Sequence, residues 1–371
     1  MKKIFYYMHI EWGWIKQRPQ FLVESLAEHY DMTVVHRRMY NRKKMQKKER
    51  EYEKTIRIIP IYAIPFLDRF RKLKRINREI VNFVVRTKMK KYKYVLINQP
   101  EQIGSIPANY SGVIMYDCMD DHSEFTDDVR IKEQTESLER KLVKRANIIF
   151  ASSNNLKKLL ETKYCNEIKN DIHVVRNGYD GNVIEIDIEE KKDMDAECTK
   201  KYVIAYFGTV SSWFNFDFIK SSLELYDNIE YRIIGPRDVS DAPKHDRINY
   251  VGVIEHDELY DAVKDVDLLI LPFKVNKLIE SVDPVKLYEY INMNKNILCC
   301  YYDEISRFEP FVYFYTDFES YIQQLKNLMG MKNVKYSPSE REKFLAENSW
   351  KVRAMEIKNI IENYEKEKGT L

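Results

Sequence analysis

A short segment in the second half of the chain, residues 283–290, combines residue types that could hold a nucleotide. Pro284 stands where a helix could begin, because proline suits the first helical turn. The N-terminus of that helix would offer free N–H groups and a positive dipole to phosphate, with added charge from Lys286 and Lys274. Glu289 lies one turn further, where its two oxygens could accept hydrogen bonds from adjacent ribose hydroxyls. The same spacing also fits a surface helix with solvated Lys286 and Glu289.

Polar and aromatic residues also follow the first apolar run of the chain, residues 4–8. Gly13 could let the backbone approach a phosphate group, because glycine has no Cβ. Trp12 and Trp14 suit the face of a sugar ring, and either could equally be a buried core residue. Arg18 comes next, before a proline, and is either a phosphate contact or a surface cation.

A third group, residues 117–122, places three carboxylates and one imidazole after an expected strand. This density of ionisable groups is costly unless something cationic or hydroxylic is bound, so these residues could orient a hydroxyl group. Asp120 and His122 are the members that we expect to position it. The alternatives are a set of capping aspartates beside an exposed histidine, or a carboxylate metal site.

The elements that must position these groups are alternating strands and helices. A strand at residues 4–8, a helical pattern at 21–30 and a strand at 33–35 form a β-α-β opening. The alternation stops after the Asn177-Gly178 turn and restarts with a strand at 202–207. Ligands bind at the carboxyl ends of strands in such sheets, where four loops gather polar residues. These loops are residues 9–20, 117–124, 208–215 and 273–290.

We therefore predict an α/β fold with two Rossmann-like, doubly wound parallel-sheet domains and a C-terminal helix that crosses back toward the first domain. A charged stretch poor in large apolar residues, 187–201, marks the linker. The predicted divisions are an N-terminal acceptor domain at 1–185, a C-terminal donor domain at 186–346, and an amphipathic helix at 347–371 that packs on the first domain.

Composition excludes several classes of protein. The chain is 44% hydrophobic and 32% charged with only 10 Gly and 11 Pro, which is typical of a folded protein rather than a disordered one. We expect no signal peptide, and the longest uncharged apolar run, residues 268–273, is far too short to span a bilayer. The five cysteines contain no C-x-x-C pair, so neither a disulfide framework nor a zinc site is indicated, and a cytoplasmic location is expected.

Charge is segregated along the chain, although the net charge is only +3. Residues 1–100 carry 25 Lys and Arg against nine Asp and Glu. The excess lies in a basic run at 37–50 and in a patterned helix at 69–83, where Ile76, Ile80 and Phe83 stand among cations. Clustered cations with intermittent apolar residues suit adsorption to anionic lipid, and a plain solvated face is the alternative.

Several motifs resemble those of GT-B glycosyltransferases in the large retaining family 4. Residues 284–290 resemble the nucleotide-binding helix of that family, and Gly208-Thr209 resembles the first loop of its donor domain. Residues 177–180 resemble the element before its interdomain crossing. Residues 12–20 and 116–121 resemble a bacterial branch that contains teichuronic acid and capsular polysaccharide biosynthesis transferases.

The resemblance implies a donor nucleotide-sugar, with UDP-sugar favoured and GDP-sugar second, and no required cofactor or metal. It implies front-face attack, in which the leaving diphosphate helps to take the acceptor proton. The expected catalytic residues are Glu11, Asp120 and His122, and the expected acceptor residues are Trp12, Trp14, Arg18, Asp117 and Asp121. The expected donor residues are Gly13, Gly208, Thr209, Lys274, Ser281, Pro284, Val285, Lys286, Leu287 and Glu289.

One position departs from the family pattern. Members commonly have a first glutamate eight positions before the second, near the donor sugar, and here Ser281 stands eight positions before Glu289. Glu280 is one residue away. Either Ser281 supplies a weaker polar contact, or a local bulge brings Glu280 into place.

The expected function is transfer of a hexose to a saccharide or polyprenyl-diphosphate-linked acceptor for bacterial surface polysaccharide, by a protein peripheral on the inner face of the cell membrane. A GT-B-like nucleotide-sugar 2-epimerase would use the same architecture without an acceptor. A nucleic-acid-binding protein would use the basic half, but no nucleic-acid motif accompanies that charge, and the run at 37–50 has few stacking aromatics.

Overall fold

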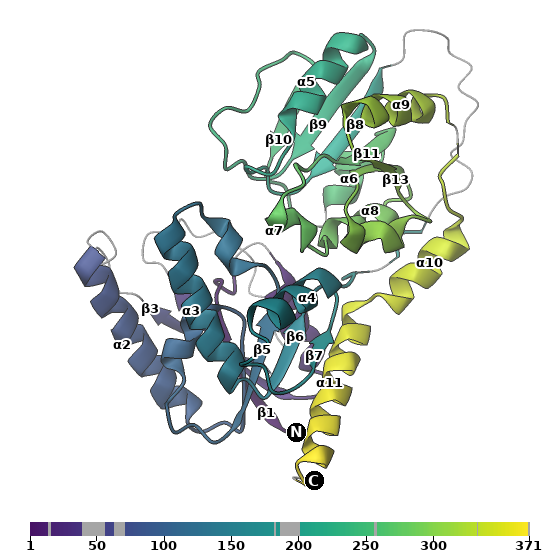
Figure 1. Ribbon diagram of the computed structural model, residues 1–371. Helices are drawn as coiled ribbons and strands as arrows, with labels where there is room; N and C mark the ends of the chain where they lie inside the picture. The colour runs from purple at the N-terminus through teal and green to yellow at the C-terminus, as the bar shows by residue number, and fades with distance from the viewer. Residues whose placement is uncertain are drawn as a thin grey trace. The chain divides into compact units, whose positions relative to one another are not determined.

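The computed structural model describes residues 1–13, 16–38, 56–62, 71–181, 183–185, 201–255, 258–331 and 333–369. These residues divide into two compact units (Figure 1). The first comprises Met1–Asp180 with Ser349–Leu371, and the second comprises Gly181–Asn348. The domain limits at 185 and 346 that we propose from the sequence lie within a few residues of these divisions.

The described part of the first unit contains one parallel sheet of seven strands: β1 (Lys3–Met8), β2 (Asp31–Arg38), β3 (Ile56–Tyr62), β4 (Tyr94–Ile97), β5 (Val113–Cys118), β6 (Ile148–Ala151) and β7 (Ile172–Val174). Their order in the sheet is β3-β2-β1-β4-β5-β6-β7. The central strands are apolar on both faces, as expected where helices cover both sides of a parallel sheet.

Helices cover both faces of this sheet: α1 (Arg18–Leu26), α2 (Arg71–Met89), α3 (Val129–Arg145), α4 (Asn154–Lys163) and α11 (Trp350–Glu367). Helices α2, α3 and α4 bury Val85, Leu142 and Leu156 against Val95 and its neighbours on one face. Tyr94 points to the other face, because side chains alternate along a strand, and its hydroxyl donates a hydrogen bond to Glu365 of α11. The C-terminal helix therefore returns to the first unit, as the sequence predicts.

The described part of the second unit contains a parallel sheet of six strands: β8 (Tyr202–Phe207), β9 (Ile229–Ile234), β10 (Ile248–Gly252), β11 (Leu268–Leu271), β12 (Asn296–Cys300) and β13 (Tyr313–Tyr315). Their order is β10-β9-β8-β11-β12-β13. The helices are α5 (Phe216–Leu225), α6 (Leu259–Val263), α7 (Lys277–Glu280), α8 (Val285–Asn292), α9 (Phe318–Met329) and α10 (Pro338–Glu347).

Both sheets reverse their strand order beside their first strand. The reversal lies between β1 and β4 in the first unit and between β8 and β11 in the second. The loops that leave the carboxyl ends of such a strand pair diverge to opposite faces of the sheet, which opens a crevice where doubly wound proteins bind ligands. Two doubly wound sheets confirm the predicted fold class, and each sheet has one such switch point.

Some sequence predictions fall outside the described residues. They are Trp14, the basic run from Arg42 to Arg50, and the first positions of the patterned helix, Arg69 and Phe70. Within the described ranges, no helix combines the length and the apolar composition needed to cross a membrane.

Candidate functional site

The switch point of the first unit is occupied by a histidine and an asparagine that the sequence analysis did not select. His9 follows β1 and Asn98 follows β4, so the two neighbouring strands deliver them to the same edge of the sheet. Asn98 Nδ2 donates hydrogen bonds to His9 Nδ1 and to the Tyr6 hydroxyl, each at 2.8 Å. A neutral His9 that accepts at Nδ1 carries its proton on Nε2.

His122 lies close enough to His9 for their charges to interact. Burial first, and then the neighbouring His9, lower the pKa of His122 to about 4, and burial likewise lowers the pKa of His9 to about 4. Both imidazoles are therefore neutral near pH 7. Among the described residues, neither His122 Nε2 nor Asn98 Oδ1 has a hydrogen-bond partner, although both atoms are buried. Unpaired buried polar atoms of this kind fit a site that accepts a polar ligand.

Asp120 is the carboxylate of this site whose proton affinity is most altered. Burial raises its pKa to about 7, against a lowering by Arg18 and a further raising by Asp117 and Asp121. A carboxyl group with a pKa near 7 can either donate or accept a hydrogen bond at neutral pH. Within the described ranges, no three His, Cys, Asp or Glu side chains are grouped as a metal site.

The shifted pKa of Asp120 predicts a specific pH dependence of stability. Below about pH 4 the carboxyl is protonated in both the folded and unfolded states, so Asp120→Asn should change the free energy of unfolding little. Between about pH 4 and 7 the unfolded state releases this proton and the folded state retains it, so wild-type stability falls as pH rises. At pH 7.5 the free energy of unfolding of the variant should therefore exceed that of the wild type by several kcal/mol, on the order of 1.4 kcal/mol for each unit by which the pKa is raised.

Urea unfolding of both proteins at pH 4.5, 6 and 7.5 checks this. His9 and His122 titrate in both proteins, so the difference between the two curves isolates Asp120. A difference that stays constant across these pH values would contradict the raised pKa.

Arg18 and Asp117 form a buried ion pair, which corrects their assignment as acceptor contacts. Arg18 is 3% exposed and Asp117 1% exposed, with Nη2 to Oδ1 at 2.7 Å and Nε to Oδ2 at 3.0 Å. Arg18 Nη1 also donates to Asn177 Oδ1 at 3.0 Å and to the Arg176 carbonyl at 3.1 Å. Arg18 is thus neither a surface cation nor a phosphate contact, and the pair fixes α1 and β5 beneath the site.

Breaking this pair should destabilise the fold. Arg18→Met leaves the Asp117 carboxylate buried without its partner, which typically costs about 3–5 kcal/mol. Urea unfolding measures this loss. Arg140→Met is the matched control, because Arg140 is half-exposed in its ion pair with Glu167 and exposed pairs contribute little to stability. If Arg18→Met and Arg140→Met lowered the free energy of unfolding equally, burial would not explain the contribution of the Arg18–Asp117 pair to stability.

Asp121 also has a structural role instead of the predicted acceptor contact. Its side chain is buried and accepts from Ser123 N at 3.2 Å and from Ser123 Oγ at 2.7 Å, which caps a short 3-10 helix, His122–Phe125. Lys163 forms an ion pair with its other oxygen at 3.3 Å. Asp121 therefore is a capping aspartate, as one of the alternatives from the sequence has it. The same alternative expects an exposed histidine, and this part is wrong, because the His122 imidazole is largely buried.

The remaining residues predicted after β1 lie apart from these contacts. Glu11 forms an ion pair with Arg38 of β2, with 3.2 Å between Arg38 Nε and Glu11 Oε1. Trp12 is half-buried and Gly13 is exposed, with no atom within 4 Å of a Cβ added at Gly13. Packing within the protein therefore does not require glycine at this position, and a side chain there would project into open space.

The switch point of the second unit brings Gly208 and Lys286 together. Gly208 follows β8 with φ +148°, a conformation that residues with a Cβ rarely adopt. A Cβ added at Gly208 would overlap the Lys286 side chain, so that side chain lies across the Gly208 backbone. Gly235 follows β9 and lies against the Gly208 backbone, because a Cβ added at Gly235 would overlap the Gly208 carbonyl. The Lys286 side chain of α8 thus lies directly against the backbone of the first loop of this sheet.

Helix α8 is fixed against the sheet by its tyrosines. The Tyr290 hydroxyl accepts from Phe207 N at 3.2 Å and donates toward the Ile270 carbonyl at 3.3 Å, which ties α8 to β8 and β11. The Tyr288 hydroxyl donates to Asp283 at 3.0 Å, and Asp283 also pairs with Arg307. These contacts hold the helix in place against the rest of the unit.

Five predicted donor residues in or beside α8 have different surroundings. Lys286 and Glu289 are half-buried and three residues apart, so they share one face of the helix. Leu287 is fully buried, so its side chain packs in the core of the unit. Pro284 is the N-cap residue, one position before the first helical turn where the sequence places it. Val285 begins the helix and is half-buried.

At the position that departs from the family pattern, the structure has a buried serine beside an exposed glutamate. Ser281 is 1% exposed, lies at the C-cap of α7, and its hydroxyl is 3.5 Å from the Lys277 carbonyl. Glu280 is exposed, and no bulge carries it inward. Lys274 is also exposed and pairs with Asp217 at 3.5 Å.

The loops after β8 and β11 are joined at this edge. Phe214 and Phe273 form an antiparallel bridge, and Lys274 N donates to the Trp213 carbonyl at 2.7 Å. Thr209 is exposed, and its carbonyl accepts from the Tyr206 hydroxyl at 2.8 Å. The predicted donor residues Gly208, Thr209, Lys274 and Lys286 therefore come from the loops and helix that border one switch point.

A polar hollow of about 900 Å³ adjoins this loop at the carboxyl ends of β9 and β10. Arg237 lies over the Tyr250 ring at 4.3 Å from its centroid, and the two line the hollow together with Gly235 and Val253. Neither Arg237 nor Tyr250 is among the residues predicted from the sequence. Their signal is positional, because Arg237 follows β9 by three residues and Tyr250 lies near the end of β10.

Comparison with known proteins yields one sequence relative and several structural ones. No protein-family model matches the chain. A Bacillus subtilis protein assigned as the teichuronic acid biosynthesis glycosyltransferase TuaH is 22% identical over 218 residues, which is 55% of this chain and 54% of that protein. The chain thus aligns with about half the length of this relative.

The solved structures that resemble this chain extend over nearly all of it. Sucrose-phosphate synthase from Thermosynechococcus elongatus has a TM-score of 0.73 at 11% identity, covering 98% of this chain and 99% of that one. HepE of Anabaena in complex with UDP-glucose has a TM-score of 0.68 at 11% identity, with 98% and 100% covered. The trehalose-6-phosphate synthase of Burkholderia multivorans has a TM-score of 0.66 at 8% identity, with 100% and 99% covered.

These likenesses confirm the fold that the motifs indicate. The shared architecture covers both sheets and the returning C-terminal helix rather than one motif. The chain has the GT-B fold of nucleotide-sugar glycosyltransferases.

Proposed function

We propose that this protein is a retaining glycosyltransferase that moves a hexose from a UDP-sugar to a saccharide or lipid-linked saccharide. The observation that carries the proposal is the contact of Lys286 with Gly208 at the switch point of the second unit, with Glu289 on the same helix face. This combination offers a cation, an open backbone and a carboxylate within one crevice. HepE binds UDP-glucose on the same fold, which supports UDP as the nucleotide.

In this proposal the donor binds along the second unit. Lys286 and the N-terminus of α8 neutralise the diphosphate, so the site needs no metal ion. Glu289 accepts hydrogen bonds from two ribose hydroxyls. The base enters the hollow that contains Arg237 and Tyr250, and GDP is the second choice of nucleotide. Thr209 and Lys274 border the entrance to this site.

The first unit then binds the groups that react. His122 Nε2 and Asn98 Oδ1, which are buried and unpaired in the described residues, meet sugar hydroxyls. Asp120 and His9 complete this polar surface. The acceptor oxygen bonds to the anomeric carbon on the face from which the diphosphate leaves, the carbon–phosphate oxygen bond breaks, and the acceptor proton passes to the departing diphosphate. The imidazoles and the carboxyl group position hydroxyls and are not strong bases.

The acceptor and the location follow from the partial relative and from charge. TuaH is assigned to teichuronic acid biosynthesis, which supports a role in bacterial surface polysaccharide or capsule. Such acceptors are commonly carried on polyprenyl diphosphate, so the protein would work on the inner face of the cell membrane. Residues 1–185 would then form the acceptor domain and 186–346 the donor domain.

A thermal-shift screen with UDP, GDP, TDP and ADP sugars tests the donor assignment. A ligand that binds only the folded state adds about 2.7 kcal/mol of stability at 100 times its Kd, so a UDP preference is readily seen. Free UDP should then accumulate only when a saccharide acceptor is added. Epimerisation of the UDP-sugar without release of UDP would favour a 2-epimerase instead, and no response to any nucleotide would overturn the proposal.

A further inference from the structure

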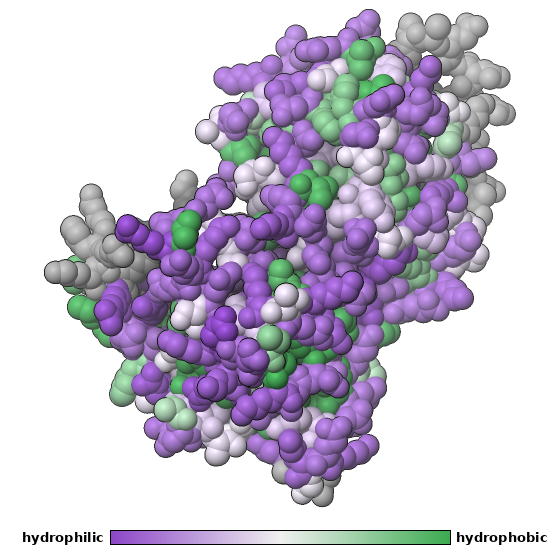
Figure 2. All heavy atoms as spheres, in the orientation of Figure 1, coloured by the Kyte–Doolittle hydropathy of each residue, from purple (hydrophilic) through white to green (hydrophobic). Residues whose placement is uncertain are grey.

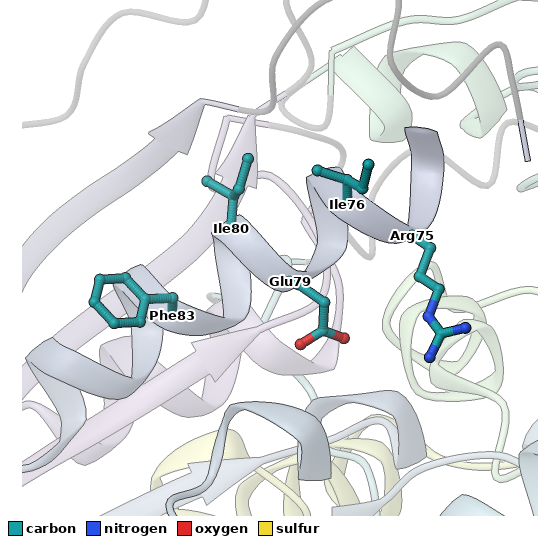
Figure 3. Close-up of a pocket in the computed structure, with 5 residues that line it drawn as sticks. All are labelled: Arg75, Ile76, Glu79, Ile80 and Phe83. Carbon is teal, nitrogen blue, oxygen red and sulfur yellow. The ribbon is translucent and has the colours of Figure 1, made fainter. Parts of the chain in front are cut away.

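Helix α2 carries three large apolar side chains on its outer face. Ile76 is 52% exposed, Ile80 42% and Phe83 64%. Their spacing of four and three residues places them on one side of the helix. Figure 3 shows them projecting from the same side of α2, while Arg75 and Glu79 point the other way; together the five residues line a shallow hollow of about 420 Å³. We call Ile76, Ile80 and Phe83 the α2 stripe.

The opposite face of α2 holds the helix in the fold without the stripe. Val81, Val85 and Met89 are buried in the core of the first unit. Asn82 Oδ1 accepts from Ser105 Oγ at 2.7 Å, and Arg86 Nη2 donates to the Gly104 carbonyl at 2.7 Å. These contacts do not involve the α2 stripe, so replacing the stripe should leave α2 in place.

The charge of α2 is almost entirely positive. Between Arg71 and Met89 the helix carries seven Lys and Arg residues and one acidic residue, Glu79. Arg75 and Arg78 are exposed near one end, and Lys88 lies in the last turn at the other. Figure 2 shows green, apolar atoms at the edge of the first unit where Figure 1 places α2, bordered by purple, polar ones.

We propose that α2 is a membrane-docking helix whose stripe enters the interfacial zone of an anionic bilayer while its cations meet the lipid headgroups. An exposed apolar stripe flanked by Lys and Arg is the pattern by which amphipathic helices lie on such membranes. A nucleic acid would use the cations but would leave three apolar side chains in water. A second copy of the chain would bring two strongly basic helices together, which their mutual repulsion opposes.

This inference rests on the proposed function in one respect, because docking brings the first unit to a lipid-linked acceptor. The binding itself needs no catalysis. Membrane binding and nucleotide binding can therefore be measured separately on the same full-length protein.

Co-sedimentation with vesicles tests the proposal. The wild type should bind vesicles of phosphatidylcholine with 30% phosphatidylglycerol, and binding should fall at least tenfold with pure phosphatidylcholine or when the salt concentration is raised tenfold. The triple variant Ile76→Ser, Ile80→Ser, Phe83→Ser should lose at least tenfold of the binding. The matched control replaces three exposed apolar residues elsewhere, Leu225→Ser, Met331→Ser and Met355→Ser, and should bind as the wild type does.

Three results would overturn the proposal: no vesicle binding by the wild type, equal binding by the triple variant, or a concentration-dependent dimer that the triple variant alone loses. Thermal stabilisation by UDP in each variant reports folding and donor binding. If UDP fails to stabilise the wild type but the triple variant still loses vesicle binding, the proposed function fails and the docking helix stands. If UDP binds normally and vesicle binding is unchanged, only the docking helix fails.

Discussion

Replacing Glu289 with Ala is expected to abolish UDP-dependent stabilisation and transfer. The proposed carboxylate contacts with two ribose hydroxyls are charge-assisted hydrogen bonds, each contributing about 1.5–3 kcal/mol. Losing both should weaken nucleotide affinity roughly 100-fold or more. Glu289 is half-buried on the face of α8 that also carries Lys286, and alanine favours helix, so the fold should persist. Titration of UDP followed by thermal shift measures the loss.

The control for this variant is Glu280→Ala. Glu280 is exposed in α7, nine residues before Glu289, and is the glutamate nearest the position where the family pattern has one. We expect this variant to bind UDP normally, because no bulge brings its side chain into the site. Normal UDP binding by Glu289→Ala would remove the donor assignment. Loss of UDP-sugar binding by Glu280→Ala, with UDP binding intact, would instead restore a donor-sugar role for Glu280.

Much of the fold follows from local sequence, because central strands of parallel sheets are apolar on both faces. The predicted strands at 4–8, 33–35 and 202–207 lie within β1, β2 and β8. The strands that the alternation missed are at the edges. β10 alternates buried with less buried residues and has no apolar run, and β13 is only three residues long. An edge strand is half-solvated, so its sequence resembles a loop.

The site was predictable where one short segment carries it. Lys286 and Glu289 belong to the same helix, so their common face can be read from spacing alone. Contacts between distant segments cannot be read in this way. Arg18 and Asp117 are 99 residues apart, and nothing in either segment reveals that they form a buried pair. His9 and Asn98 were missed for the same reason, although each is the first polar residue after a strand that flanks the switch point.

The buried geometry also changes which residues of the first unit can meet a substrate. From the sequence, all three carboxylates at 117, 120 and 121 are predicted to contact a substrate. Asp117 and Asp121 already have cationic partners in Arg18 and Lys163, so their charges are satisfied within the protein. Asp120 keeps a raised pKa, and His122 keeps an unpaired buried nitrogen. Asp120 and His122 are therefore the residues of this loop whose polar groups remain available to a substrate.

Replacing His122 with Ala should lower the rate of transfer about 100-fold while leaving UDP binding unchanged. His122 Nε2 has no hydrogen-bond partner among the described residues, so removing this nitrogen breaks no hydrogen bond there. In the reaction it would hold a sugar hydroxyl, and misplacing a reacting group can cost about 100-fold in rate. Steady-state transfer from a UDP-sugar, with thermal shift by UDP alone, separates these two effects.

His122→Gln is the informative control, because the glutamine amide nitrogen can donate a hydrogen bond from a position near that of Nε2. Partial recovery of transfer in this variant would identify positioning through a hydrogen bond as the role of the ring. Since burial holds the pKa of His122 at about 4, a positioning imidazole should give a rate that does not change with its protonation between pH 6 and 8. Full activity in His122→Ala would exclude the residue from the reaction. Together with Glu289→Ala, which should lose UDP binding itself, these variants assign nucleotide binding to the second unit and hydroxyl positioning to the first.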